Sequence, residues 1–482
     1  MARGLSSGRI RLALLIILGG ASLLPYLAAR GLGDLRAQTP GFVVAYGGAF
    51  VLYLTAAALA LRPPAEHAYP RLTLAVIGLF AIGFRLALLP ARPSLSDDMY
   101  RYVWDGRVQA QGISPYRYPP ESRELIKLRV GDRTVWRYIN RKPAVTVYPP
   151  GAQVAFAGIW RVVGDSVTGF KAAFVLAELA GGVALLGLLR AMRQPPERVL
   201  LYLWSPLLVF EVAHAGHVDG LLLPLLILAF WARVKDRPGL LGLALGAATL
   251  VKLFPALLLP ALLPLGVKGG WRERSRPAAR MLVGFAATLA AGYLPYAVQE
   301  GGVAGFLPNY LTENFNLGLA RVLFDMARWL GWPEALLANL VTFGGLAVLG
   351  ALFVLRPARD GQAALGRCVW LIGWFTVWTQ NLFPWYLLWL LPLLAIFLEP
   401  GRWLGFALAP ATAWLVFTGT AALAYLFFIR WRVITWGQVA EFAPLYLLLA
   451  ASAVTPARAA WARLAQRAAS RRMRLDDAAP IA

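Results

Sequence analysis

Repeated apolar runs, each close to the length of a membrane-spanning helix, constrain this chain more than any other feature. Runs such as Ile10–Ala29, Gly41–Leu61 and Leu72–Leu89 approach the roughly 20 residues that cross a bilayer as a helix. They lack the alternation of apolar and polar residues that marks the strands of outer-membrane barrels. Because 59% of the residues are hydrophobic, the sequence predicts an all-α, polytopic transmembrane helical bundle of about 12 to 14 spans, forming a single domain over residues 1–482.

The basic residues set the predicted orientation of the spans. The formal net charge is +23, and many arginines lie in short loops between apolar runs, where they favour the cytoplasmic side and face anionic lipid. This distribution indicates membrane lipids as partners and argues against nucleic acid. It predicts three spans in residues 1–90, an outer loop at 91–150, the remaining spans at 151–455 and a basic cytoplasmic tail at 456–482.

The outer loop is the most polar part of the chain. It opens with Asp97 and Asp98, and the spacing of the aromatic and apolar residues that follow predicts a helix lying along the membrane interface. A second interfacial helix is expected within Glu121–Arg141, and Gly151–Val163 is expected to form a half-helix at the surface. Acids, cations and aromatic rings would then share one interfacial layer, which suits a phosphorylated lipid that carries a sugar.

The predicted topology brings polar residues from distant parts of the chain to the outer side. Ionisable groups at membrane depth usually face a cavity, although each of these could also be a separately solvated loop residue. A carboxylate at the boundary of water and lipid can take a proton from an acceptor hydroxyl, so Asp97 or Asp98 is the candidate catalytic base. The alternative for this pair is that Ser96 or Asp97 caps the following helix.

A leaving phosphate requires cations where its charge develops. Lys252, shortly before the helix-breaking Pro255, is the first candidate for a donor-phosphate contact. Lys252 could instead extend to the membrane surface, as lysines near span ends do. Three arginines of the outer loop are the other candidates: Arg101, Arg107 and Arg117.

Two further clusters could contact the sugar or the acceptor. The first could hydrogen-bond sugar or phosphate, or could bind a divalent metal ion, so no cofactor is assigned; it comprises Glu211, His214, His217 and Asp219. The second offers amides and an aromatic ring suited to sugar hydroxyls and ring faces, unless it belongs only to the interfacial aromatic belt; it comprises Gln380, Asn381 and Tyr386.

These motifs resemble those of the GT-C glycosyltransferases, and within them the bacterial mannosyltransferases that use a polyprenyl-phosphate sugar donor. The resemblance rests on the paired Asp97-Asp98, on His217-Val218-Asp219, on Lys252-Leu253-Phe254-Pro255 and on Pro384-Trp385-Tyr386. It implies inverting transfer on the outer face of the membrane, with an aspartate of the first large outer loop as general base. Because metal dependence varies across that superfamily, the resemblance leaves a divalent metal ion open.

We therefore expect a glycosyltransferase of the bacterial inner membrane that serves the synthesis of envelope glycans. It would move a hexose, expected to be mannose, from a polyprenyl phosphate to a glycolipid, glycan or protein acceptor. The rival is a transporter or flippase of lipid-linked sugar, which should show related halves and polar groups near the bilayer midplane. No internal repeat is evident, and the polar residues gather on one side, which favours the enzyme.

Overall fold

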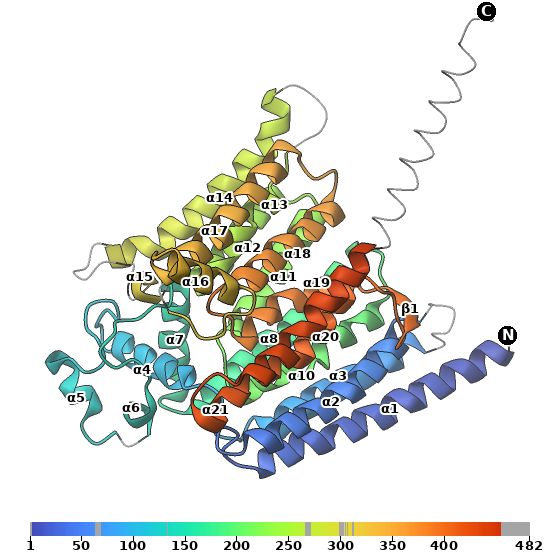
Figure 1. Ribbon diagram of the computed structural model, residues 1–482, viewed down its shortest axis with the longest axis horizontal. Helices are drawn as coiled ribbons and strands as arrows, with labels where there is room; N and C mark the ends of the chain where they lie inside the picture. The colour runs from blue at the N-terminus through green and yellow to red at the C-terminus, as the bar shows by residue number, and fades with distance from the viewer. Residues whose placement is uncertain are drawn as a thin grey trace, which may run out of the picture.

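The chain folds into a bundle of long helices that run nearly side by side (Figure 1). The computed structural model describes residues 2–62, 69–132, 134–265, 271–297, 303, 305, 307–310 and 313–454, so the predicted tail at 456–482 lies outside it. Eight helices among these residues are long and apolar enough to cross a membrane, which confirms the predicted all-α polytopic bundle. They are α1 (Ala2–Gly31), α2 (Thr39–Ala60), α3 (Pro70–Leu88), α8 (Val167–Ala191), α14 (Trp271–Ala297), α17 (Glu334–Leu355), and the stretches Pro410–Arg430 and Thr435–Val454.

Shorter helical segments pack between these long helices. Several apolar runs that are too short to cross a membrane alone are broken where proline removes a backbone donor, as at Pro206 and Pro255. The short segments are η3 (Pro196–Val199), α9 (Leu200–Leu203), α10 (Pro206–Leu208), η4 (Val209–His214), α11 (Asp219–Val234), α12 (Pro238–Val251), η5 (Phe254–Leu258), α13 (Leu259–Leu262), α18 (Gly361–Trp378), η6 (Pro384–Leu390) and α19 (Leu391–Phe397).

The remaining elements are small. The stretch Pro410–Arg430 comprises α20 (Pro410–Thr420), η7 (Ala421–Leu426) and α21 (Phe427–Arg430). A four-residue strand, β1 (Pro400–Trp403), precedes it. Two further helices, α15 (Leu307–Tyr310) and α16 (Ala320–Trp329), lie between α14 and α17 in the chain.

The outer loop forms a cluster of short helices at one end of the bundle (Figure 1). Its elements are α4 (Asp98–Ala110), η2 (Arg123–Leu125), α5 (Ile126–Arg129) and α6 (Val135–Tyr138), and α7 (Pro150–Val163) follows directly after it. The predicted helix after the aspartates and the predicted half-helix therefore both form. The single helix expected within Glu121–Arg141 is wrong, because Gly131 adopts a positive φ of 82° and the segment divides into short turns.

The helix α4 does not lie on the surface as the sequence suggested. Residues 99–108 are all buried, and α4 packs closely against α7. Gly106 makes this approach possible, since a Cβ atom there would lie 2.6 Å from the carbonyl oxygen of Phe156. The start of α4, with Asp97 at its N-cap and Asp98 in its first turn, is consequently held in place by packing rather than by lipid.

A buried ion pair fixes the long helices beneath this loop. Arg85 of α3 and Glu178 of α8 lie 2.9 Å apart with almost no exposure, and Arg85 also donates to the carbonyl of Leu203 at 2.6 Å. A charge inside the membrane is costly unless it is paired, so this pair ties α3 to α8 at a defined height. The end of α3, which leads into Asp97 and Asp98, is fixed in turn.

Candidate active site

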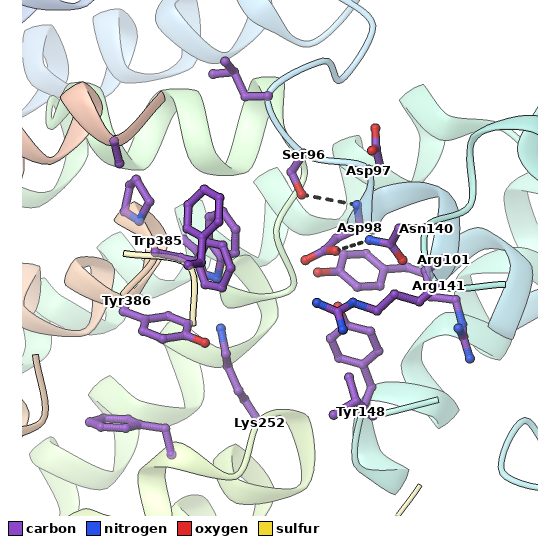
Figure 2. Close-up of a pocket in the computed structure, with 18 of the residues that line it drawn as sticks. Ser96, Asp97, Asp98, Arg101, Asn140, Arg141, Tyr148, Lys252, Trp385 and Tyr386 are labelled. Atoms are coloured by element: carbon purple, nitrogen blue, oxygen red, sulfur yellow. Dashed lines mark hydrogen bonds between the residues drawn. The ribbon is translucent and has the colours of Figure 1, made fainter. Parts of the chain in front are cut away.

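A cavity of about 770 Å³ separates the outer loop from the ends of several bundle helices. One wall comes from residues 95–102 and 140–149 of the outer loop, and the other from Lys252, η5, η6 and the region around α21. Figure 2 shows Asp98 and Asn140 on one side of this space and Lys252, Trp385 and Tyr386 on the other. The predicted outer-loop aspartates and the predicted lysine therefore line a single cavity.

Asp98 occupies the first position of α4 and turns its carboxylate toward the opposite wall (Figure 2). The Oδ1 of Asp98 accepts a hydrogen bond from the side-chain amide of Asn140 at 2.8 Å. The backbone N–H of Asp98 donates to the hydroxyl of Ser96 at 3.2 Å. The positive end of the helix macrodipole also favours a negative charge there. An amide partner orients the carboxylate without adding a charge to it.

Asp97 has a different partner and a different direction. Arg36, from the turn between α1 and α2, donates to both of its carboxylate oxygens at 3.1 and 3.3 Å. Figure 2 shows its carboxylate pointing away from Trp385 and Tyr386. Burial raises the pKa of Asp97 above its ordinary value, while the charge of Arg36 acts in the opposite sense. Asp97 occupies the N-cap position of α4, but its side chain makes no capping hydrogen bond.

Lys252 lies where α12 ends, in extended backbone immediately before the break at Pro255. Its ammonium group is 2.9 and 3.1 Å from the two carboxylate oxygens of Asp219, at the start of α11. It also lies 4.9 Å from the ring centre of Tyr386 and 5.1 Å from that of Trp389. Trp389 in turn donates to Asp219 at 2.7 Å. The lysine is thus held inside the wall rather than extended to the membrane surface.

The three arginines considered for phosphate binding have separate environments. Arg101 lines the cavity and forms an ion pair with Asp105 at 2.7 Å. Its buried Nη2 has no hydrogen-bond partner among the described residues. Arg107 lies outside the lining, where it joins Asp132 at 2.7 Å and Asp165 at 2.8 Å and so closes the outer loop on itself. Arg117 also lies outside the lining, against the ring of Tyr118.

The cluster Glu211, His214, His217 and Asp219 is buried behind the cavity wall. Glu211 accepts a hydrogen bond from the hydroxyl of Tyr425 at 2.8 Å and lies 2.9 Å from Nδ1 of His217. His217 stacks on Trp385 with ring centres 3.9 Å apart. Because Trp385 and Tyr425 line the cavity, Glu211 and His217 support its aromatic surface from behind.

His214 lies deeper, with Nε2 3.5 Å from the hydroxyl of Ser94. Gln380 and Asn381 are buried and outside the lining, whereas Tyr386 belongs to the lining. Among the residues that the structure describes, no group of three or more histidine, cysteine or acidic side chains could hold a metal ion. The side chains of the segment His214–Asp219 are therefore not arranged as a metal site. Asp219 accepts hydrogen bonds from Lys252 and Trp389, and His217 contacts the carboxylate of Glu211.

Sequence reasoning missed several lining residues. They come from segments with no recognisable motif, and only the aromatic run Phe427-Phe428 beside a predicted outer segment gave any signal. The missed polar and aromatic residues include Arg36, Asn140, Arg141, Tyr148, Trp389, Tyr425, Phe428 and Trp431.

A comparison with known protein families identifies the family of this chain. The model of the MptA_B family, described as the N-terminal domain of alpha-(1->6)-mannopyranosyltransferases, matches residues 14–268, which is more than half of the chain. The matched region holds both aspartates of the outer loop, the His217–Asp219 segment and Lys252. No curated protein gives a significant match. The chain is therefore a multi-pass membrane protein that belongs to the MptA_B family of alpha-(1->6)-mannopyranosyltransferases.

Proposed function

We propose that the protein transfers mannose from a polyprenyl phosphate to a hydroxyl of a glycan, glycolipid or protein acceptor at the outer face of the bacterial inner membrane. The observation that carries the proposal is the placement of Asp98 and Lys252 on opposite walls of one cavity. A base and a phosphate-binding cation are needed at the two ends of the bond exchange, and the sugar would lie between them.

The apolar part of the cavity supports a lipid donor. Leu257, Phe343 and Phe375 line it on the side of the long helices, and Phe343 of α17 is 41% exposed on the surface of the bundle. A polyprenyl chain could leave the cavity there without crossing water. A donor that is a soluble nucleotide sugar would have no use for such an apolar exit.

The transfer itself would need two groups of this chain. The oxygen of the acceptor hydroxyl attacks the anomeric carbon while Asp98 takes up the proton of that hydroxyl. The bond from the anomeric carbon to the phosphate oxygen breaks at the same time. Lys252, already aligned by Asp219 and the rings of Tyr386 and Trp389, stabilises the charge that grows on the departing phosphate. Inversion that yields an α-linkage requires a β-linked donor.

The purified protein should be given labelled mannose on a short polyprenyl phosphate or on a nucleoside diphosphate, with a mannose oligosaccharide as acceptor. We expect product only from the lipid donor, with a new α-(1->6) linkage and release of polyprenyl phosphate. Vesicles loaded with the labelled lipid distinguish the transporter alternative. Translocation without any new linkage would replace the enzyme by a flippase, and transfer from the nucleotide donor alone would exclude the lipid donor.

A further inference from the structure

A second group of charged side chains lies where α11 ends and α12 begins, at the ends of these helices that face away from the cavity. Two adjoining hollows of about 620 and 490 Å³ share Asp236, Arg237, Pro238 and Arg280, and we call them together the far-end pocket. Because α12 has 14 residues and rises 1.5 Å per residue, Pro238 lies about 20 Å from Lys252 along the helix. The far-end pocket is therefore separated from the cavity by about two-thirds of the roughly 30 Å hydrocarbon core of a bilayer.

Arginine dominates the lining of this pocket. Two acids offset part of this charge: Asp360, which also accepts the backbone N–H of Ala363 at 2.8 Å as the cap of α18, and Asp236, whose side chain is 87% exposed. The four arginines that line the pocket are Arg233, Arg237, Arg280 and Arg359.

Arg233 is the group that most requires a ligand. Its side chain lines the pocket and is only 4% exposed as a residue, and its Nε is buried with no hydrogen-bond partner among the described residues. Its Nη1 forms a long ion pair with the exposed carboxylate of Asp236 at 3.5 Å, which leaves the Nε donor unused. A buried guanidinium with an unused donor is costly, so an anion that enters the pocket would complete it.

Two helices also begin at this pocket. Pro238 is the first residue of α12 and Gly361 is the first residue of α18, so both positive helix ends lie at the lining. Gly361 allows the close contact, since a Cβ atom there would lie 2.7 Å from Cα of Val234 at the end of α11. Arg233 and two helix N-termini therefore favour negative charge at the same place.

The surroundings indicate which anion would bind. Trp231 and Leu240 also line the pocket, and the exposed Leu243 and Val283 continue the apolar surface along α12 and α14. We propose that the far-end pocket binds the headgroup phosphate of an anionic phospholipid, whose acyl chains lie along α12 and α14. Basic pockets between spans at a membrane face bind such headgroups in other proteins.

The test uses the full-length protein, delipidated in detergent, and native mass spectrometry with three probes: dioleoyl phosphatidylglycerol, dioleoyl phosphatidylcholine and inorganic phosphate. We expect the wild type to retain phosphatidylglycerol about tenfold more strongly than phosphatidylcholine. Arg233→Gln should lose that preference. Arg356→Gln, at an exposed arginine of the same end that lies outside the pocket, should retain it.

Because a buried arginine can also affect folding, the exposed pair Arg237→Gln/Arg280→Gln provides a second variant, with melting temperatures compared against Arg356→Gln. Loss of the preference in this pair with an unchanged melting temperature supports the site. Equal retention of the two lipids by the wild type, or an undiminished preference in both pocket variants, would overturn the proposal. Displacement of the lipid by equimolar inorganic phosphate would show a free-phosphate site instead.

Discussion

The two walls of the cavity hold their charges in different ways. In the outer-loop wall, Asp98 has a neutral amide partner and stands beside Asp97, whose own charge is engaged by Arg36. In the bundle wall, Lys252 forms an ion pair with Asp219, and Asp219 also accepts a hydrogen bond from Trp389. The loop wall therefore presents one carboxylate that is held by a neutral amide, while the bundle wall presents a cation that is held by a carboxylate.

The two walls place a paired charge and a charge with a neutral partner in different parts of the fold. Pairing inside the bundle is required, because an isolated ion in lipid is too costly, and it also orients the cation in advance. The loop is made of short helices outside the spans, so a carboxylate there can remain chemically available. Each of the following predictions tests that division.

The largest effect is expected for Asp98→Asn. Removing the proton acceptor should lower kcat by about 10³-fold with the donor KM nearly unchanged. Asp97→Asn is the matched control in the adjacent position, and its kcat should fall only about tenfold because it loses the contact with Arg36. Steady-state kinetics on labelled transfer measures both. The reverse order of the two losses would assign the base to Asp97.

The next largest effect is expected for Lys252→Met. Loss of the cation at the departing phosphate should lower kcat by about 10²-fold, whereas Lys252→Arg should recover part of it. Asp219→Asn alone should also lower kcat, because it removes the partner of Lys252. In the double variant Lys252→Met/Asp219→Asn the loss of kcat should be smaller than the sum of the two single losses, because the two residues act as one pair. Additive losses would contradict the picture of a matched cation in the bundle wall.

A smaller effect is expected behind the wall. His217→Phe keeps a ring against Trp385 but removes the contact with Glu211, so the aromatic surface should be less well oriented. The donor KM should rise about fivefold, a cost near 1 kcal/mol, with kcat within about twofold. Trp385→Leu provides a comparison that removes the surface itself. A fall in kcat without a change in KM would show that His217 takes part in the chemistry.

The smallest effect concerns the stability of the loop wall against pH. Burial raises the pKa of Asp97 in the folded protein above the value of about 3.9 expected in the unfolded chain. The folded state therefore binds the proton more readily, and stability should rise as the pH falls through the window between these two values. Asp97→Asn should lack this rise. Melting temperatures of both proteins between about pH 7 and pH 4 measure it, and parallel curves would show that Asp97 does not titrate in this window.

Comparison of the sequence with the structure shows where local patterns are sufficient. The long apolar runs predicted the spans, because length and hydrophobicity alone decide whether a helix can cross lipid. The helix after Asp98 was also predicted, but its burial was not, since the sequence of α4 resembles that of an interfacial helix. Its packing depends on Gly106 and α7, some 50 residues later.

The site was predicted in part for the same reason. Asp98, Lys252 and Tyr386 carry motifs, and the structure places them in one cavity. Arg117 lies between two tyrosines just as Arg101 does, yet of the three candidate arginines only Arg101 lines the cavity. Charge and position along the chain cannot distinguish a cation that closes a loop from one that faces a ligand, because the distinction depends on the acids that reach it.

The apolar runs were sufficient to predict the helical bundle, and the polar segments between them supply the acids, cations and aromatic rings. The partner of each of these side chains depends on the tertiary structure. Asp219 meets Lys252 because α11 and α12 form a pair of helices of similar length that return the chain to the same end. Arg36 reaches Asp97 because α1 packs against both α2 and α3, which brings the turn before α2 beside the segment after α3. Side chains meet through the geometry of whole helices, and that geometry depends on long-range packing that no local pattern contains.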